Sequence, residues 1–233
     1  MAVKKFVLKD GLAIAVYKRH SSRSIRLSVT AKGEVKVSLP FWVPYKTGVA
    51  FAESRQAWIA AQRQAPIVLA EGQIIGKSHS LHFRVSIKAT KPSSRLKAGQ
   101  IIITHPLSLL YADKSVQALA EKAAIRALRH EAAVVLPPRL QQLATEHGFS
   151  YTAVSIKQLT GRWGSCDQHG RIALNLFLMQ LPWELIDYVL LHELVHTKHM
   201  NHGEDFWAAL EAVVPGAKKL RTAIRKHKPV VVS

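Results

Sequence analysis

Residues 192–196 read His-Glu-Leu-Val-His, and this short stretch constrains the chain more than any other. On an α-helix, His192 and His196 project from one face, one turn apart, so both imidazoles can bind the same metal ion. Glu193 lies about 100° around such a helix from His192, close to the metal but off the line of the two ligands. The pattern is typical of zinc hydrolases, in which the glutamate is the general base for a water on the metal.

Chance is a poor explanation of this pattern. In 233 residues with 12 histidines, about 0.03 copies are expected at random. A further histidine at one fixed position lowers that number about twentyfold. The competing interpretation is an amphipathic helix whose histidines bind no metal, and the spacing favours a zinc site over it.

A catalytic zinc needs a third protein ligand and leaves its fourth position to water. His199 would continue the helical line of His192 and His196, about 10 Å along the axis from His192, which suits a tetrahedral metal poorly. His202 follows Asn201, a residue type that tolerates the left-handed conformation of helix ends, so the chain could turn there. We therefore predict one zinc ion bound to His192, His196 and His202. The weaker ligand candidates are Glu204 and Glu211.

The composition is that of a globular protein from a reducing compartment. Hydrophobic residues make up 48% of the chain, enough for a large core and one or two domains. The single cysteine, Cys166, excludes an internal disulfide and fits a cytoplasmic location. No stretch approaches 18 consecutive apolar residues, so we expect no membrane span. The start of the chain reads as strands and not as a signal peptide.

Positive charge is concentrated in the N-terminal half. The whole chain has a net charge of +18. Residues 1–112 hold 18 Lys and Arg against 4 Asp and Glu, a net +14, which leaves +4 for residues 113–233. Such a surface could bind nucleic acid or another polyanion. Because the basic residues alternate along strands and form no block, a basic surface without a dedicated partner is slightly favoured.

Up to about residue 105 the sequence alternates as β-strands do. Hairpins are expected at Asp10-Gly11 and Lys32-Gly33, because such pairs suit tight turns. A single helix is expected to start near Pro44 and to end before Pro66. No internal repeat is visible in the sequence.

Beyond residue 113 the period changes to that of helices. A helix break is expected at Pro137-Pro138, and the helix with the metal ligands is expected over residues 182–199. We therefore predict an α+β fold, with a β-rich basic region over 1–112 and an α+β domain that carries the metal site over 113–233.

The stretch Arg-Trp-Gly-Ser-Cys at residues 162–166 is the other unusual feature. Gly164 has no side chain, so the backbone there can come close to another group. In zinc hydrolases of this general build an edge strand lies along the metal helix and can pair with an extended substrate. Trp163, Gly164 and Ser165 are therefore candidate substrate-binding residues, although a core tryptophan beside a tight turn explains them equally well. Cys166 is interpreted as a small buried residue.

Three motifs together resemble the YgjP-like family of predicted metal-dependent hydrolases. They read RSIRLSVTAKGEVKVSLP, RWGSCDQHGRIALN and YVLLHELVHTKHMNHGEDFW. SprT-like proteins are more distant relatives. The resemblance implies a zincin-like C-terminal domain over 113–233, with His192, His196 and His202 as ligands and Glu193 as catalytic base.

The ligand spacing also matches metzincin proteases, but two positions depart from their pattern. Position 199 is His where metzincins carry Gly. No Met follows Met200, so the methionine turn beneath their zinc is missing.

Three functions of different classes are compatible with these patterns. We favour a zinc-dependent hydrolase that acts on a peptide or protein substrate, with Tyr188 or Arg162 as candidates for holding the oxyanion. The alternative is a nucleic-acid-associated protein, such as a DNA-linked protease, that docks through its basic N-terminal half. A structural zinc protein is the third, and Glu193 argues against it, because a structural site has no use for a base.

Overall fold

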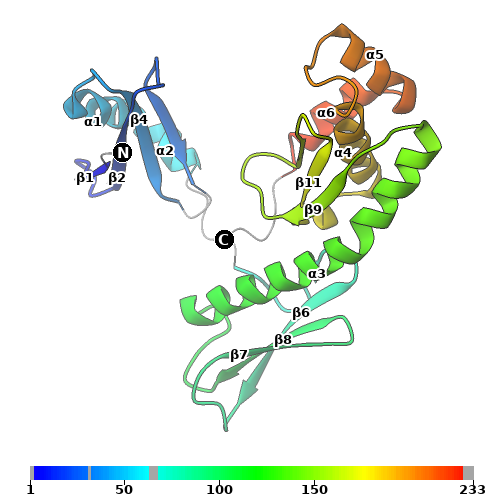
Figure 1. The fold of residues 1–233 in the computed structure, drawn as a ribbon. Helices are drawn as coiled ribbons and strands as arrows, with labels where there is room; N and C mark the ends of the chain where they lie inside the picture. The colour runs from blue at the N-terminus through cyan, green and yellow to red at the C-terminus, as the bar shows by residue number, and fades with distance from the viewer. Residues whose placement is uncertain (1–2, 31–32, 63–67, 228–233) are drawn as a thin grey trace. The chain divides into compact units, whose positions relative to one another are not determined.

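The computed structural model describes residues 3–30, 33–62 and 68–227 (Figure 1). The chain divides into two compact units that separate between residues 67 and 68. Both contain helices and strands, so the predicted α+β class is confirmed. None of the described helices is long and apolar enough to cross a membrane.

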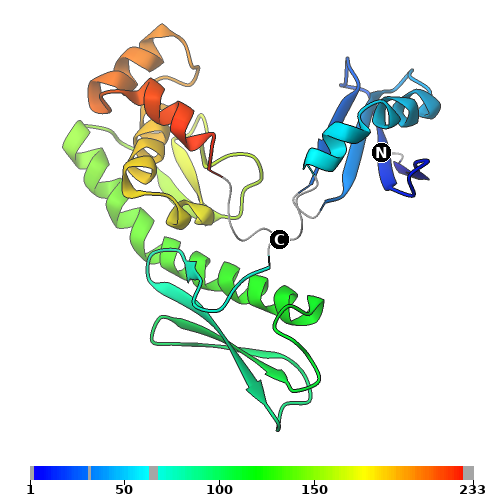
Figure 2. The same cartoon turned by 180° about the vertical axis from the view of Figure 1, so that it is seen from behind.

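The first unit is a four-stranded sheet with two helices packed on one face (Figures 1 and 2). Its strands have the order β1-β2-β4-β3, in which β2 and β4 are parallel and the outer pairs are antiparallel. Alternate strand residues such as Val16 and Val37 are buried together with Ile59 of the second helix. The elements are β1 (Val3–Val7), β2 (Ala13–Arg19), β3 (Arg26–Val29), β4 (Val35–Pro40), α1 (Tyr45–Glu53) and α2 (Gln56–Gln62).

The single helix expected between Pro44 and Pro66 is in fact two helices. Helix α1 ends at Glu53, and the hydroxyl of its C-cap residue Ser54 donates to the carbonyl of Phe51 over 2.9 Å. A serine hydroxyl bonded to the preceding turn competes with the helical backbone bonds, which favours a break at this point. The end of the expected helix, residues 63–65, lies outside the described residues.

The second unit is built from two sheets and a long helix that contacts both. One sheet has the order β5-β6-β8-β7 and the other has the order β10-β11-β9. Helix α3 packs against strands of each, and one continuous core joins them to the C-terminal helices. The elements before the metal helix are β5 (Ile74–Ile75), β6 (His79–Ser86), β7 (Ser93–Lys97), β8 (Gln100–Pro106), α3 (Lys114–His147), β9 (Ala153–Lys157), β10 (Gly164–Cys166), β11 (Arg171–Asn175) and the 3₁₀-helix η1 (Leu176–Gln180).

Helix α3 continues through Pro137 and Pro138, so the predicted helix break is wrong. A proline inside a helix removes a backbone hydrogen bond and costs about 3 kcal/mol. Leu136 and Leu140, which flank the pair, are fully buried. Burial of one such side chain stabilises by about 1.5–3 kcal/mol, so the packing offsets the cost of the prolines. Figure 1 shows α3 as one uninterrupted helix.

The sheet of residues 74–106 belongs to the second unit, whereas the sequence led us to expect a boundary between residues 112 and 113. A buried carboxylate explains part of the attachment. Glu131 of α3 accepts hydrogen bonds from the backbone N–H of Lys77 (2.7 Å) and from the hydroxyl of Ser78 (2.8 Å). Strand β8 also packs against α3 through buried Ile101 and Ile103. Such contacts between distant segments leave no periodic signal in the sequence.

The two four-stranded sheets repeat one topology. Strands β5 to β8 have the same order and the same relative orientations as strands β1 to β4. Each sheet is followed by a helix, α1 or α3. The repeat is hidden in the sequence because a strand position specifies burial more than residue identity. Val37 of β4 and Ile103 of β8, for example, fill corresponding buried positions.

Candidate metal centre and active site

Helix α4 (Trp183–Val195) carries the His-Glu-x-x-His stretch at its C-terminal end, with His196 as the C-cap residue. It starts directly after Pro182, a residue type suited to helix starts. The helix ends at Val195 and not near residue 199 as expected. The hydroxyl of Thr197 donates to the carbonyl of Leu194 over 2.7 Å, which takes up one of the last helical carbonyls.

The turn after α4 brings a third histidine back to the first two. Possible ligand atoms of His192, His196 and His202 all lie within 4.8 Å of one another. The Nε2 atoms of His192 and His202 are 3.1 Å apart, and the His196 ring lies 4.6 Å from the His202 ring. The turn does not use a left-handed Asn201, since Ala98 is the only described non-glycine residue with positive φ. Three imidazole nitrogens around one point match the donor set of zinc.

His199 contributes a backbone atom to the site. Its carbonyl oxygen lies 3.0 Å from Nδ1 of His196, close enough to accept a hydrogen bond from that nitrogen. This bond holds the ring in the tautomer that leaves Nε2 free to bind a metal.

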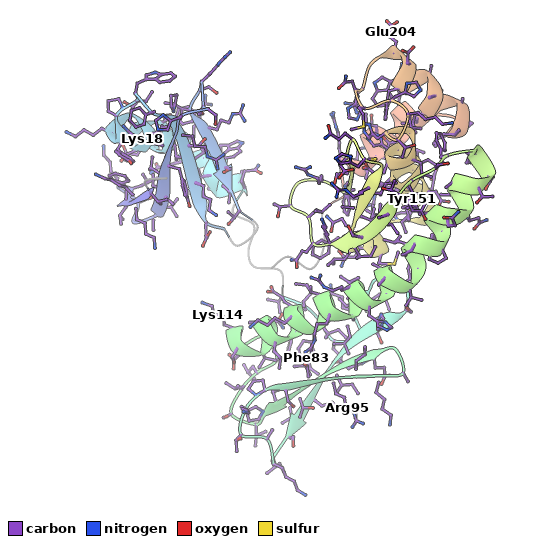
Figure 3. All side chains as sticks on the ribbon, viewed as in Figure 1. Lys18, Phe83, Arg95, Lys114, Tyr151 and Glu204 are labelled. Carbon is purple, nitrogen blue, oxygen red and sulfur yellow. The ribbon has the colours of Figure 1, made fainter. Side chains whose placement is uncertain are left out.

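The two weaker ligand candidates, Glu204 and Glu211, have different surroundings. Glu211 accepts a hydrogen bond from the backbone N–H of Gly216 (2.6 Å), and Glu204 is exposed at the start of α5 (Glu204–Val213; Figure 3).

A buried phenylalanine forms the floor of the histidine group. Phe206 of α5 is fully buried, and its ring centre lies 4.9, 4.6 and 4.6 Å from those of His192, His196 and His202. Sequence reasoning missed this residue. The available signal was its position near the start of an amphipathic helix that follows His202. Because the buried Phe206 ring contacts all three imidazoles, it excludes water from that side of the group.

Glu193 is buried beside the histidines, with 4% of its surface exposed. Burial raises the pKa of its carboxyl to about 8, and the positive charge of Arg162 acts in the opposite direction. Its Oε2 atom is buried and has no hydrogen-bond partner among the described residues. The same is true of Nδ1 of His192. A buried carboxylate oxygen without a partner is costly unless a ligand or a water meets it, which fits a site built around a bound group.

Burial also keeps His192 in the form that can bind a metal. Its pKa is lowered to about 3, first by burial and then by His196, His202 and Arg221. The imidazole is therefore neutral at physiological pH, as a metal ligand must be. His192 therefore binds a divalent cation without competition from protons at neutral pH.

Strand β10 brings the second unusual sequence stretch against Glu193. A Cβ atom built on Gly164 would lie 2.6 Å from Oε1 of Glu193, so only glycine allows this approach. β10 is an edge strand that pairs with β11 on one side only. Trp163 is half-buried against the core. Ser165 lies on the opposite face of the strand from Gly164, because neighbouring strand residues alternate.

Cys166 shares the face of Gly164 and is partly buried against the core. Burial raises the pKa of its thiol to about 11, with further contributions from Glu193 and Asp167. A thiol with so high a pKa stays protonated at neutral pH and is unreactive. The interpretation of Cys166 as a small packing residue therefore fits its surroundings.

Tyr188 and two arginines border the histidine group. The Tyr188 ring lies one turn before His192, with ring centres 5.9 Å apart, and burial raises the pKa of its hydroxyl. Arg221 of helix α6 (Ala217–Ile224) was not singled out from the sequence. Its guanidinium lies 4.8 Å from the ring centre of Trp207. Its positive charge opposes the burial that raises the pKa of Tyr188, and it adds to the burial that lowers the pKa of His192. Two positively charged side chains, Arg221 of α6 and Arg162, thus border the site.

The sequence is similar to a family of metallopeptidases and to two solved metallopeptidase zymogens. No curated protein matches the sequence. The solved metallopeptidase zymogen of Pyrococcus abyssi, abylysin, is 26% identical, over 43% of this chain and 90% of that chain, with a TM-score of 0.34. The metallopeptidase zymogen of Methanocaldococcus jannaschii, jannalysin, is 19% identical, over 44% of this chain and 94% of that chain, also with a TM-score of 0.34. The model of the YgjP-like metallopeptidase domain matches residues 23–227, and the chain therefore belongs to the YgjP-like metallopeptidase family.

Proposed function

We propose that this metallopeptidase hydrolyses peptide bonds in peptide or protein substrates with one zinc ion, held by His192, His196 and His202. The observation that carries the proposal is the convergence of three imidazoles within 4.8 Å beside a buried carboxylate. Bound zinc would act as a Lewis acid and would lower the pKa of a water ligand. A group of three histidines without a base would fit a structural metal site as well as a catalytic one. The presence of Glu193 favours the catalytic site.

Glu193 is the general base in this proposal. Burial raises the pKa of its carboxyl to about 8, and the charge of a bound zinc ion would lower that pKa and keep the group ionised. The carboxylate accepts a proton from the attacking water while the water oxygen bonds to the substrate carbonyl carbon. The proton then passes to the leaving nitrogen as the carbon–nitrogen bond breaks. The partnerless Oε2 of Glu193 is the atom available for this transfer. The same residue therefore acts as base in the first half of the reaction and as acid in the second.

Substrate binding is assigned to the free edge of β10. An extended peptide can pair with the backbone of Gly164 and Ser165, which places its carbonyl near Glu193. In this proposal the exposed part of Trp163, the residue before Gly164, contacts a substrate side chain. Tyr188 and Arg162 are the proposed donors to the oxyanion. Besides burial, Glu193 contributes to the raised pKa of the Tyr188 hydroxyl, and Arg162 acts to lower the pKa of Glu193. Both groups therefore lie within electrostatic range of Glu193.

Cleavage of a peptide library by the purified protein tests this proposal, with products identified by mass spectrometry. We expect cleavage that stops when a chelator removes the metal and returns when one equivalent of zinc is added. The test uses the full chain, and a metal assay accompanies each sample. A library left intact by protein that contains its zinc would contradict the peptidase proposal.

Gly164→Ala is expected to slow hydrolysis about 10- to 100-fold and to leave the zinc content unchanged. The added Cβ would overlap Glu193 and displace its carboxylate, and a misplacement of about 1 Å can cost about 100-fold in rate. Gly203→Ala is the matched control, because a Cβ there meets nothing within 4 Å, although it adjoins His202. Turnover and metal content of both variants are the measurements. Equal turnover of the two would show that β10 does not position Glu193.

A second function, association with nucleic acid, is favoured by the distribution of charge between the units. Residues 1–67 hold 12 Lys and Arg against 3 Asp and Glu, a net +9, which is half of the total charge of +18. Salt-dependent binding is the signature of such a surface, because each phosphate contact releases counterions. We propose that the first unit binds the polyanion, while the metal site acts on protein.

A further inference from the structure

We propose that the face of the first sheet turned away from α1 and α2 binds single-stranded nucleic acid. This inference rests on the proposed association with nucleic acid and is independent of the peptidase activity. It names the surface and the class of nucleic acid, neither of which the net charge identifies. The surface, here called the open face, comprises Lys5, Ala15, Tyr17, Arg26, Lys36 and Ser38.

Strand register assigns these residues to one side of the sheet. Val16 pairs with Val37, and both are buried under the helices, so the residues between them point the other way. Ala15 pairs with Lys5 on one side and with Lys36 on the other. Ser38 lies between Tyr17 and Arg26 in the next row. None of the six residues of the open face is buried.

The cations of the open face are spread across its full width. Lys5 lies on β1 and Arg26 on β3, the two edges of the sheet, so about 14 Å of sheet separates them. Lys36 lies between them on β4 and is paired with Glu34 over 3.4 Å, although both side chains are well exposed. Exposed pairs of this kind contribute little, so Lys36 can exchange Glu34 for a phosphate. Neither Lys5 nor Arg26 has an acidic partner within salt-bridge distance among the described residues.

Small side chains and one aromatic ring occupy the space between the cations. Ala15 and Ser38 have small side chains, so nothing bulky projects from the centre of the open face. Tyr17 is paired with Ser38 in the strand register. Tyr17 is partly exposed, so one side of its ring can offer a stacking surface for a base. Stacking is possible only for bases that are not already paired and stacked within a duplex. The combination of an uncovered sheet face, a ring and spread cations is therefore matched to a single strand.

A duplex and an anionic membrane fit the open face less well. The bases of double-stranded DNA are already paired and stacked, so Tyr17 could not stack on them. An anionic membrane attracts basic clusters by charge alone, and the small side chains Ala15 and Ser38 offer little apolar surface to insert between lipids. Both remain as competing outcomes in the experiment.

Binding of the full chain to a fluorescent 15-nucleotide oligo(dT) tests the proposal, by anisotropy at several salt concentrations. We expect the double variant Lys5→Gln/Arg26→Gln to bind about tenfold more weakly. Its salt slope should fall by about 1.4, because each lost contact to a single strand removes about 0.7 from the slope. Tyr17→Leu should weaken binding at least about fivefold with an unchanged slope, since it removes stacking and no charge.

The matched control is Lys46→Gln/Arg55→Gln. It removes the same types of charge from the same unit, but Lys46 lies on α1 and Arg55 follows it, on the helical side of the sheet. Figure 3 shows Lys18, another lysine of this unit, which lies on the helical side too because it pairs with buried Leu39. The control should change binding less than about twofold and leave the slope unchanged. Thermal melts confirm that each variant is folded.

Several results would overturn the proposal. Equal losses in the two double variants would mean that net charge, and not the open face, binds the oligonucleotide. Tighter binding of a 15-base-pair duplex, or of vesicles with 30% phosphatidylserine, would show that the ligand class is wrong. No binding at about 50 mM salt would remove the nucleic-acid proposal altogether. None of these outcomes affects the peptidase proposal, which the metal and cleavage assays test separately.

Discussion

Alanine at His192, His196 or His202 is expected to reduce bound zinc from about one ion per chain to background. Each change removes one of three converging imidazoles, and two protein ligands do not hold a catalytic zinc tightly. Metal binding and folding are linked, so the variants should also melt at a lower temperature. With free zinc about 1,000-fold above its Kd, the lost stabilisation is about 4 kcal/mol. For a unit of this size that corresponds to roughly 10 °C.

His199→Ala is the control that tests the choice of ligands. The structure uses the backbone carbonyl of His199, which alanine retains, to orient His196. The variant should therefore keep its zinc and its melting temperature. Metal content by mass spectrometry and thermal melts with and without zinc are the measurements. The ligand assignment is wrong if His199→Ala loses zinc while His202→Ala keeps it.

Glu193→Gln is expected to slow hydrolysis by about 100-fold or more and to leave the zinc content nearly unchanged. Glutamine has the shape of glutamate but cannot accept a proton from water at neutral pH, and loss of a general base costs about 10²–10⁴-fold. Glu193 is not a member of the histidine group, so its replacement removes no ligand. The melting temperature should also change little, because the side chain keeps its volume in the buried site.

Comparison of Glu193→Gln with His192→Ala separates catalysis from metal binding. The first variant should lose turnover with the metal in place, and the second should lose metal, stability and turnover together. Zinc stoichiometry, thermal melts and turnover on one peptide are measured for both. Full activity in Glu193→Gln would contradict the proposed mechanism. Loss of zinc from this variant would make the glutamate a ligand and would favour a structural metal site.

Local patterns in the sequence determined the parts of this protein that depend on neighbours in the chain. The four-residue spacing of His192 and His196 places both on one face of any helix, so the proximity of their side chains could be predicted without knowledge of the fold. The hairpin β1–β2 follows in the same way from Asp10-Gly11 between two alternating stretches. The motif with His202 also led to the family, because its spacing is rare in sequences of this composition.

Only the tertiary structure decided what depends on contacts between distant segments. Phe206 beneath the three histidines and Gly164 against Glu193 join parts of the chain that share no periodic pattern. Helix α3 runs through Pro137 because packing on both sides offsets a local penalty that sequence reasoning took as decisive. The attachment of residues 74–106 to α3 rests on Glu131, a buried acid 54 residues from its partner Lys77. Propensity and spacing act over a few residues, whereas the burial of apolar surface and of charge is decided by the whole fold.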